Sequence, residues 1–126
     1  MATAPIHILV LLILATFSAT GSAQQTIALP TLPDNQEMLI LSVDLEPGQA
    51  STPHRHNAHV FVYVVAGAVE MQVRGGPLLK LEPGDTFYEA PDDIHQVSRN
   101  ASSTEPATFI VHMLRIPGTA VSLPVD

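Results

Sequence analysis

Histidines are the residues of this sequence with the clearest capacity for chemistry, because imidazole binds transition metals and moves protons near neutral pH. Of the six histidines, His54 and His56 are separated by a single residue. In an extended segment, side chains two residues apart point to the same side, so this pair could bind one ion. His95 follows a turn-forming stretch and leads into another β-like segment, which makes it the natural third ligand. The alternative is a solvated polar loop of histidines that binds no metal.

The composition limits what else such a site could be. The chain has no cysteine, which excludes disulfides, thiolate nucleophiles and Cys-rich zinc or iron–sulfur sites. Five Lys and Arg residues against twelve Asp and Glu residues give a formal net charge of -7. This balance provides no basic face for a phosphate backbone or an anionic membrane. We therefore expect a small-molecule ligand or substrate, no nucleic acid partner, and no membrane contact beyond export.

The first 23 residues differ from the rest and predict a secretory signal peptide. The apolar run Ile8–Ala15 is followed by small residues, and Gly21-Ser22-Ala23 provides small side chains before a cleavage point at Gln24. The run is short for a membrane span, which needs about 20 apolar residues, although an uncleaved anchor is an alternative. We expect a signal peptide over residues 1–23, a mature domain over residues 24–126, and a secreted or periplasmic location.

The elements that must position the histidines are β-strands. Pro and Gly recur along residues 24–126, and breaks at about every 8–12 residues are typical of all-β sandwiches and barrels. The strand-like segments are Met38–Leu45, Val60–Val65, Ala68–Val73 and Thr108–Leu114. Val60–Val65 is β-branched and aromatic throughout, so we expect both of its faces to be buried. Ala66-Gly67 predicts a tight turn after it, and Gly75-Gly76 predicts the next one.

These residues together resemble the two sequence motifs of the small cupins. The residues that match are Gly48, His54, His56 and Gly67 for the first motif, and Gly84, Pro91 and His95 for the second. The two motif regions cover over half of residues 24–126. The resemblance implies an all-β fold, an antiparallel jelly-roll (cupin-like) barrel, with a metal site at its mouth. The family's metal histidines correspond to His54, His56 and His95.

Departures from the family pattern leave the metal site open to three interpretations. The family's usual metal-binding Glu falls at Val60, which cannot bind a metal, and Asp92 replaces the Gly of the second motif. The site could be a three-histidine triad with open water positions, as in cupins that oxidise thiols or diketones. His59, one place early, could act as a fourth ligand, although strand alternation argues against it. The site could also be degraded, with the barrel kept for binding or for structure.

Other residues could transfer protons, but the sequence assigns none of them a catalytic role. The candidates by residue type are Glu70, Tyr88, Glu89 and His112. We expect Glu70 and Glu89 to be solvated residues on sheet faces, and His112 to be a hydrogen-bonded core residue in an apolar strand. Arg55 should point away from its histidine neighbours and lie on the surface. Asn100-Ala101-Ser102 is a glycosylation sequon, for which chance occurrence is the simpler explanation.

The expected function is that of an exported small cupin-like protein with a divalent metal on three histidines. The metal could be Fe, Mn, Zn, Ni or Cu. Open positions on such an ion would permit a metal-dependent dioxygenase, or a related lyase or isomerase, acting on a small oxygen-rich molecule, although Val60 in place of the family's Glu favours a binding role. The alternatives are a non-catalytic cupin that binds or senses a small ligand, and a purely structural barrel. The resemblance also implies a homodimer, which an exposed β edge would permit.

Overall fold

The computed structural model describes residues 34–126, which form β-strands and no helix. The strands are β1 (Glu37–Leu45), β2 (His54–Arg55), β3 (His59–Ala66), β4 (Val69–Val73), β5 (Leu79–Leu81), β6 (Thr86–Glu89), β7 (His95–Asn100), β8 (Ala107–Arg115) and β9 (Leu123–Pro124). The predicted signal peptide lies outside the described residues. Within residues 34–126 there is no helix with the length and apolar character needed to cross a membrane.

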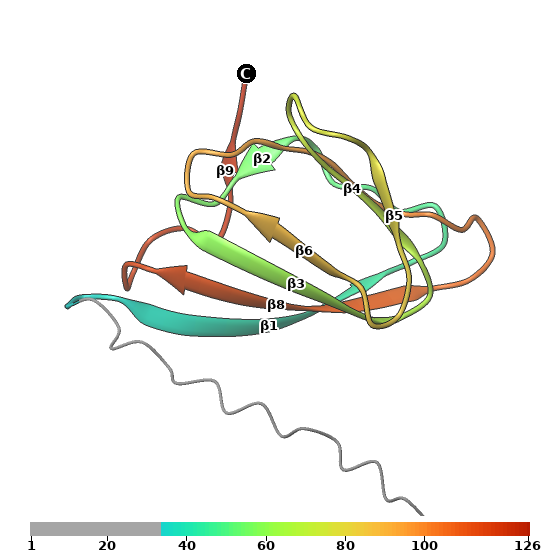
Figure 1. Cartoon of the computed structure of the whole chain (residues 1–126), viewed down its shortest axis with the longest axis horizontal. Helices are drawn as coiled ribbons and strands as arrows, with labels where there is room; N and C mark the ends of the chain where they lie inside the picture. Colours follow the sequence, from blue (N-terminus) through green and yellow to red (C-terminus); the bar gives the residue numbers. More distant parts are fainter. Residues whose placement is uncertain (1–33) are drawn as a thin grey trace, which may run out of the picture.

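The strands form two antiparallel sheets that face each other. One sheet has the order β1-β8-β3-β6, and the other has the order β5-β4-β7-β2-β9. Figure 1 shows the first sheet below, with β2, β4, β5 and β9 of the second sheet above it. Strands far apart in the sequence pair directly, as β1 does with β8 from Glu37↔Arg115 to Leu45↔Ala107. This architecture agrees with the all-β, antiparallel jelly-roll fold expected from the sequence.

The inward faces of both sheets form one apolar core. Its buried residues are Leu45, Ala58, Val60, Val62, Val64, Val69, Met71, Leu81, Ala107, Phe109, Val111 and Met113. In β3 the burial alternates, and Phe61, Tyr63 and Val65 on the outer face are each 47% exposed. The expectation that both faces of this segment are buried is therefore wrong. In the part of the chain that the structure describes, no layer covers the outer face of this sheet, so only the inward residues are enclosed.

Two glycines of the motif pattern fix how β3 joins its neighbours. Gly67 lies in the predicted turn between β3 and β4 with a φ of 70°, and a Cβ there would lie 2.4 Å from the Pro106 carbonyl oxygen, so only glycine fits. Gly84 has a φ of 98°, and its amide donates a hydrogen bond to the Val64 carbonyl. The next residue, Asp85, accepts a hydrogen bond from the Val64 amide, which starts the pairing of β6 with β3.

Asn100 is a buried link between β7 and two loops. Its Nδ2 donates hydrogen bonds to the carbonyl oxygens of Leu45 (3.2 Å), Glu46 (3.1 Å) and Glu105 (2.8 Å). Its Oδ1 accepts a hydrogen bond from the Ser102 amide at 2.8 Å. The nitrogen that a glycan would modify is thus engaged in the folded domain, which favours a chance origin for the sequon.

We predict that Asn100→Ala lowers the free energy of unfolding by about 3 kcal/mol, because the carbonyl groups of Leu45, Glu46 and Glu105 lose their donor and a buried side chain is truncated. Asn100→Asp should be at least as destabilising, since it places a carboxylate among those carbonyl oxygens. Urea denaturation of both variants would measure the loss. Ser103→Ala, which changes an exposed residue of the same loop, is the matched control and should be neutral. An Asn100→Ala variant as stable as the parent would contradict this role.

Candidate metal centre

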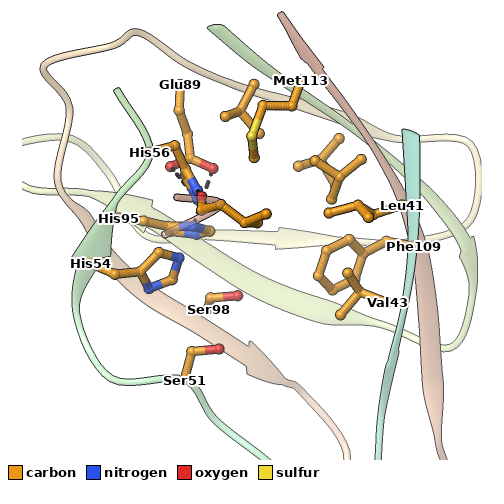
Figure 2. A pocket seen from close by; sticks show the side chains of 14 residues that line it. Leu41, Val43, Ser51, His54, His56, Glu89, His95, Ser98, Phe109 and Met113 are labelled. Carbon is orange, nitrogen blue, oxygen red and sulfur yellow. Dashed lines mark hydrogen bonds and ion pairs between the residues drawn. The ribbon is translucent and has the colours of Figure 1, made fainter. Parts of the chain in front are cut away.

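The structure brings the three predicted histidines together. His54 and His95 are direct cross-strand partners of β2 and β7, and His56 follows β2 immediately. One nitrogen of each ring lies within 4.8 Å of one nitrogen of each of the others. His95 is buried, with 4% of its surface exposed, while His54 and His56 are partly buried. Figure 2 shows the three rings gathered at one side of a cavity.

Backbone carbonyl groups set which nitrogen His54 and His56 present to the cavity. His54 Nδ1 lies 2.7 Å from the Thr52 carbonyl oxygen, and His56 Nδ1 lies 2.6 Å from the Val121 carbonyl oxygen. A carbonyl oxygen only accepts, so each Nδ1 carries the proton, and Nε2 of the neutral ring keeps its lone pair. Metal-binding histidines are held in this way in proteins generally. The Val121 contact depends on β9, which pairs with β2, and sequence reasoning gave this C-terminal segment no role.

Glu89 is the residue that the sequence analysis misplaced. The expectation that it is solvated is wrong, because only 2% of its surface is exposed. Its Oε1 lies 3.1 Å from His95 Nδ1, and its Oε2 lies 3.8 Å from His56 Nε2. The cause is the register of β6 against β3, in which Glu89 is opposite Val60 on the inward face. Alternation within the segment Thr86–Glu89, with Phe87 turned inward, is the signal that could have revealed it.

His59 and His112 lie away from this cluster, on the outer face of the four-stranded sheet. His59 Nδ1 forms a hydrogen bond with Tyr88 Oη at 2.7 Å, so the structure does not bring it in as a fourth ligand. His112 is opposite Phe61 and is only partly buried, so its interpretation as a core residue is also wrong. Strand alternation explains both positions, because Val60 and Met113 beside them point inward.

The other polar candidates are surface residues. Glu70 is opposite Arg99 on the neighbouring strand and forms an ion pair with it, away from the cavity. Arg55 is exposed between the two histidines, as strand alternation predicts. Tyr88 is 47% exposed on the outer face. None of these three side chains lines the cavity at the histidines.

The cavity has a volume of about 120 Å³ and is divided into a polar and an apolar side. The polar side carries the three histidines with Glu89, Ser51 and Ser98, and the apolar side includes Leu41, Val43, Val62, Phe109, Val111 and Met113. Figure 2 shows Leu41, Val43 and Phe109 across the cavity from the histidines. A small molecule with one polar end and an apolar remainder fits such a lining.

The donor set on the polar side fits a divalent transition metal. Imidazole nitrogens and a carboxylate oxygen are the ligands that Zn, Fe, Mn, Ni and Cu accept from proteins without cysteine. Two of these atoms, His95 Nε2 and Glu89 Oε2, are buried without a hydrogen-bond partner within the described residues. Unpartnered buried polar atoms are costly, and a bound cation would remove that cost.

The electrostatics of the cluster keep His54 neutral. Burial lowers the pKa of His54 below its ordinary value of 6.5, and the charges of His56 and His95 lower it further. The hydrogen bond with Thr52 and the charge of Glu89 act in the opposite direction but do not outweigh burial. A neutral imidazole is the form that binds a metal, so the site keeps this ligand available in mildly acidic solution.

We predict that His54 of the metal-free protein titrates below pH 6.5 when its ring signals are followed by NMR. Below that pH the unfolded chain binds a proton that the folded chain does not. Stability should therefore fall as the pH drops from about 6.5 to the folded-state pKa, and His54 should make no contribution to this pH dependence above about pH 6.5. His54→Gln should lose that part of the pH dependence. A His54 pKa at or above 6.5 would contradict the prediction.

Comparisons with known proteins agree with this fold. Residues 41–113, more than half of the chain, match the family model described as a cupin domain. Over 89 residues the chain is 30% identical to (R)-mandelonitrile lyase from Granulicella tundricola, an alignment that covers 71% of this chain and 66% of that protein.

Two solved structures show the same architecture. The DMSP lyase DddQ from Ruegeria pomeroyi matches with a TM-score of 0.60 and 24% identity, over 66% of this chain and 41% of that one. A Klebsiella pneumoniae protein with a double-stranded β-helix domain matches with a TM-score of 0.59 and 24% identity, over 83% and 88% of the two chains. The chain thus spans about two fifths of the DMSP lyase and just under two thirds of the mandelonitrile lyase. With both motif regions inside the matched residues, the chain belongs to the cupin family.

Proposed function

We propose that this protein is a divalent-metal enzyme of the lyase type, acting on a small molecule that has one hydroxyl-bearing end and an apolar remainder. The observation that carries the proposal is the convergence of three histidines on the polar side of a largely apolar cavity. The similarity to a mandelonitrile lyase supports a lyase over the dioxygenase that the histidine triad alone suggested.

His54, His56 and His95 would hold the ion. His54 and His56 offer Nε2, because their Nδ1 atoms are bound to backbone carbonyl groups. His95 adds a third imidazole from β7, buried and in contact with Glu89. An ion bound here would act as a Lewis acid on a hydroxyl or carbonyl oxygen of the substrate.

The apolar side of the cavity would bind the remainder of the substrate. Phe109, Leu41 and Val43 provide an apolar surface that excludes water and suits a phenyl or alkyl group. A molecule with polar groups at both ends would leave some of them unpaired against this wall. Of the small oxygen-rich molecules expected from the sequence, we therefore propose one whose polar groups are all at one end.

Mandelonitrile has this character, since one carbon carries a hydroxyl group, a nitrile and a phenyl ring. Its cleavage needs no oxidant: the hydroxyl group loses its proton, the bond to the nitrile carbon breaks, and cyanide takes up a proton as benzaldehyde forms. Ser51 and Ser98 line the polar side and supply hydroxyl groups that could hydrogen-bond the nitrile.

We predict that the protein, loaded with Mn, Fe, Zn, Ni or Cu in turn, forms benzaldehyde from mandelonitrile without consuming oxygen. Benzaldehyde absorbance and an oxygen electrode would follow the two quantities, with metal content measured on the same samples. His54→Ala/His56→Ala should lose the metal, and its rate should fall to that of the uncatalysed reaction.

His59→Ala is the matched control, because this histidine lies on the outer face of the four-stranded sheet and contacts Tyr88, not the cavity. It should keep both metal and activity. Oxygen consumption with a diol, diketone or thiol would instead support the dioxygenase. A metal-loaded protein that converts none of these compounds would support a binding or sensing cupin. Absence of metal after reconstitution would contradict the proposal altogether.

We also propose export and a homodimer. The N-terminal sequence pattern supports export. The outer face of the four-stranded sheet, where Phe61, Tyr63 and Tyr88 are each 47% exposed, supports association with a second copy. The N-terminal sequence of the chain recovered from its host tests export, which predicts a start at Gln24. The mass of that chain in solution tests the homodimer, which predicts twice the mass of one chain.

A further inference from the structure

Val60 and Glu89 are direct partners across the β3–β6 pairing. Both side chains face the barrel interior, with 1% and 2% of their surfaces exposed. Side chains of such partners on one face of an antiparallel pair have Cβ atoms about 4.5–5.5 Å apart. Glu89 thus brings a carboxylate from β6 to the region of the interior where the first cupin motif has its glutamate on β3.

The carboxylate of Glu89 lies within reach of an ion bound by two of the histidines. Its Oε2 is 3.8 Å from His56 Nε2, and its Oε1 is 3.1 Å from His95 Nδ1. Two ordinary bonds from one ion to nitrogen and oxygen ligands add up to about 4.2 Å. The His56 separation is shorter than this sum, so one ion can contact both Glu89 Oε2 and His56 Nε2. The 3.1 Å contact is a hydrogen-bond distance, and it holds the carboxylate beside His95. His56 Nε2 is also the nitrogen left free by the Val121 hydrogen bond.

The burial of Glu89 calls for a positive partner. Within residues 34–126, the ion-pair contacts of its carboxylate are with His56 and His95, and Lys and Arg residues are absent from them. Its Oε2 is buried without a hydrogen-bond partner. A buried carboxylate is stable only when it is paired or binds a metal. A protonated His95 could pair with it and needs no metal, but that pair leaves Oε2 and His95 Nε2 unengaged.

We propose that Glu89 is the fourth, anionic ligand of the metal centre, supplied from β6 in place of the motif glutamate of β3. This inference rests on the proposed metal centre. On this inference the carboxylate has moved from position 60 on β3 to Glu89 on β6, and Val60 is not a sign of a degraded site. The ion would carry one negative ligand in place of the all-neutral set expected from the histidines alone.

The test is the affinity for Zn²⁺ alone, measured by competition with a chromophoric chelator. Glu89→Gln keeps the shape and removes the charge, and we expect its affinity to fall about 100-fold, the upper end of the effect seen for groups that only support a ligand. The double variant Val60→Glu/Glu89→Val moves the carboxylate across the strand pair and should recover affinity to within about tenfold. Glu70→Gln removes an outward-facing carboxylate and should leave the affinity unchanged.

Thermal unfolding of the metal-free proteins provides a second readout. Glu89→Gln should be at least as stable as the parent without metal, because it removes a buried charge, and should gain less stability on adding Zn²⁺. A metal-free Glu89→Gln protein that is clearly less stable would overturn the ligand role in favour of an ion pair with His95.

Parent-like affinity of Glu89→Gln would overturn the inference and leave the histidine centre intact. Weak binding by Glu89→Gln without recovery in a folded double variant would likewise overturn direct ligation. A parent protein that binds no Zn²⁺ or other divalent metal would overturn the proposed function itself.

Discussion

The energetic cost of burying polar groups is the constraint on which this site depends. Three imidazoles and a carboxylate lie at one end of an apolar core, where each would be destabilising without a partner. Two imidazole N–H groups are bound to the carbonyl oxygens of Thr52 and Val121, and the carboxylate contacts the other ring. Glu89 Oε2 and His95 Nε2 stay without a hydrogen-bond partner in the described residues, and the divalent cation that we propose for the cluster would offset the cost of burying such atoms.

The fold meets this constraint through the pairing of short strands with their neighbours. β2 has only two residues, yet it lies between β7 and β9, so the His54 backbone is paired on both sides. The C-terminal segment contributes both this pairing and the carbonyl group that orients His56. On the opposite sheet, the β3–β6 pairing sets the depth of Glu89. The proposed ligands thus come from both sheets of the barrel.

The sequence predicted the parts of the structure that depend on local pattern. The spacing of His54 and His56, the order of the motifs and the turns at Gly67 and Gly75 are local features, and the barrel and the histidine cluster follow from them. Alternation within Thr86–Glu89 could indicate the inward face of Glu89, but its place opposite Val60, 29 residues earlier, depends on the register of β6 with β3, which no local pattern specifies. For this reason Val60 looked like a lost ligand, although its cross-strand partner carries a carboxylate.

The exposure of the outer face of β3 was missed for a related reason. A run such as VFVYVV is equally compatible with a strand buried on both faces and with one whose outer aromatic residues meet no second layer. Only the arrangement of the sheets decides between the two, and here the outer face of the four-stranded sheet is uncovered in the described residues.

A crystal structure of the metal-loaded protein, with anomalous diffraction collected at the absorption edge of the metal, tests the central claim most directly. One anomalous peak should lie about 2.0–2.2 Å from Nε2 of His54, Nε2 of His56, a nitrogen of His95 and an oxygen of Glu89. A peak elsewhere, or a peak bound by the histidines with Glu89 turned away from it, would contradict a four-ligand centre with its carboxylate on β6.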